Sequence, residues 1–530
     1  MNFDQSRKRF ILCNDGGTLL GPNSEAPMGI DEFAKITIGA LENTHINTFY
    51  WQLGTDPYMS TPTHRYSDIY SHATDVAPQW GEGIESFETA GAWRIYENTR
   101  HMRELGTDPA EVVVERGHEA GIQVLLSMRV NDIHDGFSTS EDPEILSSTK
   151  KSHPEWLLGP VKNAASSGRL RKFSRFAYDF GIDDVRAYKL SIATEAIEKY
   201  DLDGLDWDFC RFPRFFQEGR ARQNADLITD MLRVLRAKLD EKSAATGEKK
   251  LLSVRVPPTF ELALGFGLDV QTWIDEGLID ILIAGVVHGS LHRVPVEEYV
   301  EATRGRDIEV IAQNLGLFWW NRPFSARVLW NEPDVFSPEM CRASAATYWR
   351  AGVDGLYLWN NHLIEFNRYA PSHRQPWREI GDPDVIDKLD KHYVIDTPPN
   401  WEDVAAELGG PPVPPGQLPV SISEAGQTVS AIIDIADDIA GERRPSEIVV
   451  KLLITNLTSQ DSVTYMLNDV PIEPAQIETR LLYNECWVII QPSEGQLKRG
   501  WNQISVSVSA RNLRVAAPLS WDSAEVIVKY

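Results

Sequence analysis

The feature that most constrains the fold is a regular alternation of apolar, β-rich runs with helical patterns, from the start of the chain to about residue 365. Segments with apolar residues at helical spacing separate the runs, for example 99–120, 183–200, 226–242 and 338–351. The expected strands are 10–14, 48–53, 123–129, 204–209, 252–256, 279–287, 309–313 and 355–359. Strands that alternate with helices pair in parallel through right-handed crossovers, and eight of them can close a (β/α)8 barrel.

An open, doubly wound sheet is the alternative for such a pattern. The first expected strand runs into C-N-D-G-G-T-L-L, which lacks the G-x-G-x-x-G phosphate loop of dinucleotide-binding folds. The chain also contains no Walker A pattern. The sequence therefore predicts an α/β chain with a (β/α)8 TIM barrel.

The pattern changes in the last quarter of the chain. Residues 408–419, L-G-G-P-P-V-P-P-G-Q-L-P, have the composition of a linker. From residue 420 to 530 short strands follow one another, with turn residues between them and no helical pattern. We expect a barrel domain over 1–407, with a packed extension after the eighth strand, a linker over 408–419, and an all-β, jelly-roll-like sandwich over 420–530.

Two carboxylates stand inside an otherwise apolar strand, in L-D-G-L-D-W-D-F-C-R-F-P (202–213). Residues two apart on a strand share a face, so Asp206 and Asp208 point the same way. If this is the fourth barrel strand, the two acids point inward near the C-terminal mouth, where barrel enzymes keep their chemistry. A buried carboxylate without a partner is costly. The alternative is that the acids pair with arginines and only brace the barrel; the candidates are Arg129, Arg211 and Arg255.

The same stretch resembles known carbohydrate-active families. D-G-L-D-W-D-F-C (203–210) is similar to the fourth-strand signature of family 18 glycoside hydrolases, D-G-x-D-x-D-x-E, with Cys210 in place of the glutamate general acid. Residues 178–190 and 200–209 more closely resemble the glycosyl-hydrolase-like family 10 barrels, and this likeness covers residues 8 to about 365. It implies a carbohydrate-active barrel. Because the glutamate is missing, it does not imply an acetamido-assisted, chitinase-like mechanism.

Polar and aromatic side chains also gather at the C-terminal ends of the other expected strands. Amide, carboxylate, imidazole and guanidinium groups suit sugar hydroxyls, and flat indoles suit the C–H faces of sugar rings. Any one of these residues could instead have a purely structural role, so the crowding is the signal. The predicted substrate-binding residues are Asp15, Trp51, Arg129, Asn131, Arg211, Arg255, His288, Asn314, Trp319, Trp359 and Asn360.

Glycoside hydrolysis normally uses two carboxyl groups, one as an acid and one as a base or nucleophile. Asp208, nearer the mouth, is the predicted general acid, and Asp206 is its charge partner or a stabiliser of the oxocarbenium-like state. The sequence leaves open whether a second catalytic carboxylate comes from another loop, with Asp15, Asp132, Glu218, Glu261 and Glu365 as the candidates.

Two other functions remain open. A metal-dependent hydrolase could use Asp208 with His134, His288, His292 and His362, although no H-E-x-x-H occurs. A non-catalytic carbohydrate-binding protein could use the same mouth and the tryptophans of the C-terminal domain, Trp487, Trp501 and Trp521. The glycosidase interpretation expects neither a metal nor another cofactor.

Bulk properties narrow the partners. The formal net charge of −25 disfavours nucleic acid and anionic membranes. No run approaches the ~20 apolar residues of a membrane span. The four cysteines form no C-x-x-C pair, and the first 30 residues lack a secretory pattern, so we expect a reducing, cytoplasmic location. A periplasmic or secreted protein without its signal peptide is the alternative. A carbohydrate is the expected partner, and a homo-oligomer is compatible with the sequence.

Overall fold

The computed structural model describes residues 8–20, 27–53, 90–133, 146–161, 174–286, 292–314, 324–330, 336–359, 374–395, 416–441 and 444–530. Eight parallel strands pair in sequence order and the eighth pairs with the first, so the barrel is closed. The strands are β1 (Arg9–Asn14), β2 (Thr48–Gln52), β3 (Gln123–Arg129), β4 (Gly204–Asp208), β5 (Leu251–Val256), β6 (Ile281–Ala284), β7 (Glu309–Gln313) and β8 (Gly355–Trp359). The predicted barrel is confirmed.

The larger helices of the barrel follow the predicted pattern with one correction. The helices are α1 (Ile30–Thr37), α3 (Ala90–Glu104), α4 (Pro109–Glu119), α5 (Ser148–Ser152), α7 (Asp183–Lys199), α8 (Ala225–Thr246), α9 (Phe260–Gly265), α10 (Val270–Asp275), α11 (Glu297–Ala302), α12 (Phe324–Trp330), α13 (Pro338–Ala351) and α14 (Pro383–Ile386). The single helical segment expected over 99–120 is two helices. Gly106 has a φ of 85°, and the Asp108 side chain caps α4, with Pro109 in its first turn.

Strand alternation divides the apolar side chains of the barrel between two cores. The outer core lies between the strands and the helices and includes Phe49, Trp51, Leu205 and Trp207. The inner core fills the barrel with side chains that include Ile11, Leu125, Ile281, Ile311 and Tyr357. The N-terminal end of the barrel is closed by the buried Arg9, which donates hydrogen bonds to Glu309, Thr48 and Gln123. A packed interior of this kind leaves the C-terminal mouth for chemistry.

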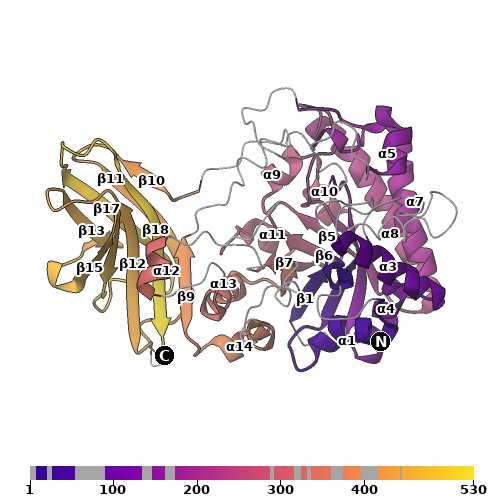
Figure 1. The fold of residues 1–530 in the computed structure, drawn as a ribbon, viewed down its shortest axis with the longest axis horizontal. Helices are drawn as coiled ribbons and strands as arrows, with labels where there is room; N and C mark the ends of the chain where they lie inside the picture. Colours follow the sequence, from indigo (N-terminus) through magenta and orange to yellow (C-terminus); the bar gives the residue numbers. More distant parts are fainter. Residues whose placement is uncertain are drawn as a thin grey trace.

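The C-terminal region forms the expected β-sandwich, beside the barrel in Figure 1. Its strands are β10 (Val420–Ile422), β11 (Thr428–Ile435), β12 (Glu447–Thr455), β13 (Ser462–Leu467), β14 (Val470–Pro471), β15 (Ile477–Leu482), β16 (Glu485–Ile490), β17 (Gly500–Ala510) and β18 (Leu519–Lys529). One sheet has the order β10-β18-β12-β16-β15, and the other has the order β11-β17-β13-β14. Most of the expected linker, 408–415, lies outside the described residues.

One strand of the sandwich precedes the expected linker. β9 (Lys391–Ile395) pairs antiparallel with β18 and so extends the first sheet. It also packs against α13 of the barrel, and Figure 1 shows it between the two parts. Within the described residues, no helix combines the length and apolar character that crossing a bilayer requires.

Candidate active site at the mouth of the barrel

The paired acids of β4 point into the barrel near its C-terminal end. Asp206 lies level with Ser127 of β3 and Ser253 of β5, while Asp208 lies level with Arg129 and Arg255. The intervening Trp207 belongs to the outer core. Side chains alternate between the two faces of a strand, so Asp206 and Asp208 point inward while Trp207 points outward. The same alternation places Ser127 and Ser253 directly beneath Arg129 and Arg255. Both acids are buried, with exposed fractions of 0% for Asp206 and 1% for Asp208.

Asp208 is the anionic half of a buried, bidentate ion pair. The Nε and Nη2 atoms of Arg255 donate to its two carboxylate oxygens at 2.9 and 2.7 Å, and the backbone N–H of Cys210 donates at 3.0 Å. The remaining Nη1 of Arg255 donates to Gln313 and to the carbonyl of Val286. Burial opposes the charge of Arg255, but the charge of Asp208, the neighbouring Tyr357 and Cys210 and the hydrogen bonds to Asp208 together outweigh it, so the pKa of Arg255 is raised. The pairing with Arg255 that the sequence left open is therefore present.

Asp206 is held differently, by two hydroxyl groups. Ser127 and Ser253 donate to its carboxylate oxygens at 2.6 and 2.7 Å. Burial, and then the charge of Asp208, raise the pKa of Asp206 to about 7, and the two serine bonds only partly offset this. Of the pair, Asp206 is thus the member suited to hold a proton near neutral pH, whereas the sequence assigned the general acid to Asp208.

A second cluster of opposite charges lies at and just after the ends of β3 and β1. Arg129 is fully buried, and its guanidinium lies 3.4 Å from a carboxylate oxygen of Asp15 and 3.5 Å from one of Asp132. Burial opposes its charge, and the two acids raise the pKa of Arg129. Two of the candidate second carboxylates, Asp15 and Asp132, therefore share one arginine.

The indole of Trp359 lies at the centre of the arginines. The guanidinium carbons of Arg211, Arg255 and Arg129 lie 5.2, 5.3 and 5.7 Å from its ring centre. These distances are within the range of cation–π attraction. Trp359 is the last residue of β8 and belongs to the inner core, so it faces the barrel axis as expected. Four of the predicted residues therefore meet at one point.

Arg211 depends on an unusual backbone turn just after β4. Phe212 has a φ of 60°, which is rare for a bulky residue, and its side chain is buried. The guanidinium of Arg211 lies 4.6 Å from the Phe212 ring and also over Trp359. A strained turn of this kind is typical of functional segments.

Three predicted contacts have other roles. Trp51 points outward, because it is one residue out of phase with the inward Tyr50, and its ring packs edge-on against Phe33 at 5.4 Å. Asn131 uses its amide on the backbone, with hydrogen bonds to Tyr178 and Arg214. Asn314 donates to Ser344 of α13, away from the axis. None of the three is carried into the proposed site.

The remaining candidates lie in exposed positions, in a buried position, or outside the described residues. Glu261 is exposed on α9 and pairs with Arg222, so it does not join the acids at the mouth. His292 is buried, and burial lowers its pKa to about 3. Within the described ranges no group of three or more His, Cys, Asp or Glu residues is placed to hold a metal. The following predicted residues lie outside the described residues: His134, His288, Trp319, Asn360, His362 and Glu365.

Two residues of the site, Ser127 and Ser253, were not singled out from the sequence, and both bind Asp206. Gln313, which the sequence places at the end of the seventh strand, binds Arg255. The signal that could have found the serines is their position two residues before Arg129 and Arg255, on the same inward face.

Comparisons with known proteins give a fold-level likeness. No family model matches the chain, and no curated protein matches it, so the resemblance to families 10 and 18 stays a prediction. Solved structures similar to the whole chain include an α-amylase from Geobacillus thermoleovorans (13% identity, TM-score 0.40, covering 97% of this chain and 100% of that one). A maltogenic α-amylase from Thermotoga neapolitana has 12% identity and a TM-score of 0.37, with coverage of 95% and 99%.

The PgaB glycoside hydrolase domain from Bordetella bronchiseptica covers 70% of this chain and 99% of its own length, with 10% identity and a TM-score of 0.39. These identities and scores are too low to carry an argument about function. The site itself must therefore carry the functional argument.

Proposed function

We propose that this protein is a glycoside hydrolase that acts on an oligo- or polysaccharide at the C-terminal mouth of the barrel. The observation that carries the proposal is the pair of inward carboxylates on β4, in which Asp208 is ion-paired with Arg255 and the pKa of Asp206 is raised to about 7. Two neighbouring acids whose environments separate their protonation states are the usual basis of acid–base chemistry. The indole of Trp359 lies beside them, 1% exposed, with its ring centre 5.3 Å from the guanidinium carbon of Arg255.

In this proposal Asp208 is the anionic catalytic residue. Its negative charge stabilises the positive charge that develops on the anomeric carbon in the oxocarbenium-like transition state. Arg255 holds the carboxylate in one orientation through two hydrogen bonds. Asp206 lies one inward position deeper. In this proposal it is protonated, so it adds no second negative charge beside Asp208. The second catalytic carboxylate is then Asp15 or Asp132, which flank Arg129.

The test is a screen of hydrolysis over plant, algal and bacterial oligosaccharides, with products separated by chromatography. For the substrate found, Asp208→Asn should lower kcat by about 10³-fold or more while sugar binding persists. Asp15→Asn and Asp132→Asn, compared side by side, should identify the second catalytic carboxylate by the limb of the pH–rate profile that is flattened: the basic limb if the group acts as an acid, the acidic limb if it acts as a base. Asp438→Asn, on the exposed surface of the sandwich, is the control and should keep full activity.

A second function, non-catalytic carbohydrate binding, is favoured by one specific observation. Both oxygens of Asp208 are already engaged by Arg255, and its side chain is buried. If this reading holds, some glycan will bind with no product formed after long incubation, and Asp208→Asn will alter stability only. A chelator separates both readings from a metal-dependent hydrolase, because it should leave glycosidase turnover unchanged.

A further inference from the structure

One face of the C-terminal sandwich has an unusual composition. Along β17, alternate side chains enter the sandwich core, and these include Ile504, Val506 and Val508. The side chains between them face away from the core, and they are Trp501, Gln503, Ser505, Ser507 and Ser509. β17 is a central strand, paired with β11 on one side and β13 on the other. The composition of its outward row therefore sets the character of the whole face.

The outward side chains of the neighbouring strands β11 and β13 opposite this row are also uncharged. Opposite Ser507, Ser505 and Gln503, strand β11 presents Thr428, Ser430 and Ile432, and strand β13 presents Thr464 and Met466 opposite the two serines. We call these ten residues the neutral face; the next outward position of β11, Asp434 opposite Trp501, lies at its border and is paired with Arg350. None of these ten side chains is charged, in a chain whose formal net charge is −25. Exposed strands usually carry charged residues, so the lack of charge calls for a physical reason.

The hydroxyl groups of the neutral face are fixed in place by each other. Thr428 and Ser507 share a hydrogen bond of 2.7 Å, and Ser430 and Ser505 share one of 2.8 Å. Ser505 is 1% exposed and also accepts a hydrogen bond from Gln503, so the positions that remain for a ligand are those of the Thr428–Ser507 pair and of Ser430. The pairs repeat along the strand at the two-residue period, roughly 7 Å apart. The result is a preorganised row of neutral polar groups.

An exposed indole stands at one end of this row. The exposed fraction of Trp501 is 46%, and that of the diagonal neighbour Ile432 is 47%, whereas the other two sandwich tryptophans, Trp487 and Trp521, are 0% exposed. Arg293 from the barrel lies 5.9 Å from the Trp501 ring and covers part of it. Beside them, Asp434 is paired with Arg350 of the barrel. The apolar platform of Trp501 and Ile432 thus adjoins the hydroxyl row without a free charge between them.

We propose that the neutral face binds an uncharged polysaccharide chain, at a site separate from the barrel mouth. Indole and aliphatic surface suits the C–H faces of sugar rings, and a row of hydroxyl and amide groups suits their hydroxyls. Polyanions are disfavoured because none of the ten side chains is cationic, and Arg293 beside Trp501 already pairs with Glu297 and Asp434. A second copy of the chain is disfavoured because the side chain of Gln417 occupies the backbone N–H and C=O of Ile432 on the β11 edge. The two exposed apolar residues are also too few to form the apolar core of a stable protein interface.

The experiment measures binding of the full chain to polysaccharides by affinity electrophoresis and by depletion from solution. The neutral probes are starch, xylan, mannan, a mixed-linkage β-glucan and cellulose, and the anionic probes are pectate and heparin. At least one neutral probe should bind. Trp501→Ala and, independently, Ser507→Glu should each weaken that binding about tenfold or more. Tyr483→Ala should leave it unchanged, because that residue is 84% exposed on the hairpin of the other sheet.

The outcomes separate this proposal from the hydrolase proposal. Binding needs no turnover, so Asp208→Asn should bind the neutral probe as the wild type does. Far-ultraviolet circular dichroism and a melting curve for each variant exclude simple unfolding. Ser507→Glu leaves the contact between Trp501 and Arg293 intact, so its effect on binding is separate from that contact. The proposal is overturned if no neutral probe binds, if both face variants bind like the wild type, or if sedimentation shows that the face joins two copies.

Discussion

The pair of Asp208 and Arg255 gives the sharpest prediction for single residues. Both side chains are 1% exposed, so removing either partner leaves an uncompensated buried charge. We expect Asp208→Asn and Arg255→Met each to lower the free energy of unfolding by about 3–5 kcal/mol. The double variant should recover much of that loss, because it buries no unpaired charge. Urea unfolding of all four proteins measures the coupling, and strictly additive losses would show that the ion pair is not the cause.

Asp206 gives a prediction about pH. The folded protein holds a proton on Asp206 up to about pH 7, whereas a carboxyl group in the unfolded chain loses its proton near pH 4. Between these values the unfolded state binds fewer protons, so this group's contribution to stability is fully present below about pH 4 and is lost as pH rises through 7. The slope is at most about 1.4 kcal/mol per pH unit.

Asp206→Asn should remove that slope. The free energy of unfolding, measured in urea at several values from pH 4.5 to 8, should fall less steeply for the variant than for the wild type. The difference between the two proteins should therefore shift in favour of the variant as the pH rises. Parallel pH profiles would contradict the raised pKa and return Asp206 to the role of an ordinary ionised partner.

The inward direction of both acids could be predicted from the sequence, whereas their partners could not. Period-two alternation in D-G-L-D-W-D-F places Asp206 and Asp208 on one face whatever the rest of the chain does. Which of three arginines meets Asp208 depends on the register of β4 against β5, which pairs Asp208 with Arg255 across 47 residues of sequence. The pKa of Asp206 depends on burial and on the charge of Asp208 beside it, which the sequence alone could not rank, and the role of Asp208 as general acid stays a prediction.

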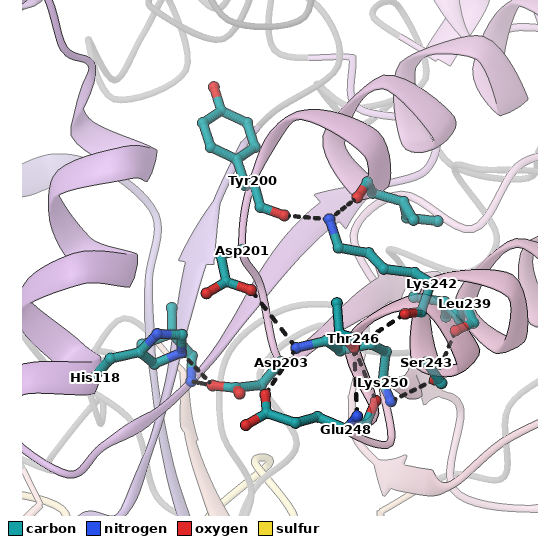
Figure 2. Close-up of polar contacts among 12 residues, drawn as sticks. His118, Tyr200, Asp201, Asp203, Leu239, Lys242, Ser243, Thr246, Glu248 and Lys250 are labelled. Atoms are coloured by element: carbon teal, nitrogen blue, oxygen red, sulfur yellow. Dashed lines mark hydrogen bonds and ion pairs between the residues drawn. The ribbon is translucent and has the colours of Figure 1, made fainter. Parts of the chain in front are cut away.

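Strand β4 also depends on a polar contact at its N-terminal end, shown in Figure 2. His118, at the end of α4, lies 3.0 Å from a carboxylate oxygen of Asp203, and the other bond to the same oxygen comes from the backbone N–H of Val124. The hydrogen bond to Asp203 raises the pKa of His118 against the opposing effect of burial. The contact therefore links a helix to the start of two adjacent strands.

This contact should make stability depend on the charge of one histidine. Because the folded pKa of His118 is raised, its contribution is fully present below about pH 6.5 and is lost as pH rises through the folded value. His118→Gln should therefore lower the melting temperature more at pH 5.5 than at pH 9. His153→Gln, at a half-exposed histidine, is the matched control and should change little. An equal loss at both pH values would point to lost packing instead.

Gly204 shows that part of the D-G-L-D-W-D motif is structural. A Cβ atom at this first residue of β4 would lie 2.4 Å from the carbonyl oxygen of Leu251 on β5. We expect Gly204→Ala to lower the free energy of unfolding by about 3 kcal/mol or to prevent folding. Gly39→Ala is the control, because its Cβ would meet nothing closer than 3.6 Å. Denaturant midpoints compare the two, and equal midpoints would mean that the strands separate at no cost.

The boundaries of most strands could be predicted because each is a short apolar run between turn residues. The break between α3 and α4 was missed, although Gly106, Asp108 and Pro109 mark it, because apolar spacing continues across it. Strand β9 was missed for a different reason. Its five residues, K-H-Y-V-I, become a strand only through pairing with β18, which lies more than 120 residues further along the chain. Such long-range pairing has no local signal.

Because β9 belongs to the sandwich sheet and also packs on α13, the barrel and the sandwich share buried contacts. Asp437, after β11, accepts hydrogen bonds from Lys391 of β9 at 2.8 Å and from Tyr530 at 2.7 Å, and it also binds Tyr393. On another side, the indole N–H of Trp487 donates to Ser325 of α12 at 2.7 Å. These contacts favour a chain that unfolds as one unit.

A substitution of Asp437 tests whether the barrel and the sandwich unfold together. The side chains of Asp437 and Lys391 are each 2% exposed, so Asp437→Asn leaves a buried ammonium group without its counter-charge and should cost about 3–5 kcal/mol. Asp438→Asn, one residue along and exposed, is the matched control. Calorimetry should show one transition that moves as a whole to lower temperature in Asp437→Asn and stays in place in Asp438→Asn. Two transitions, of which only one moves, would mean that the barrel unfolds independently of the sandwich and that β9 binds them only loosely.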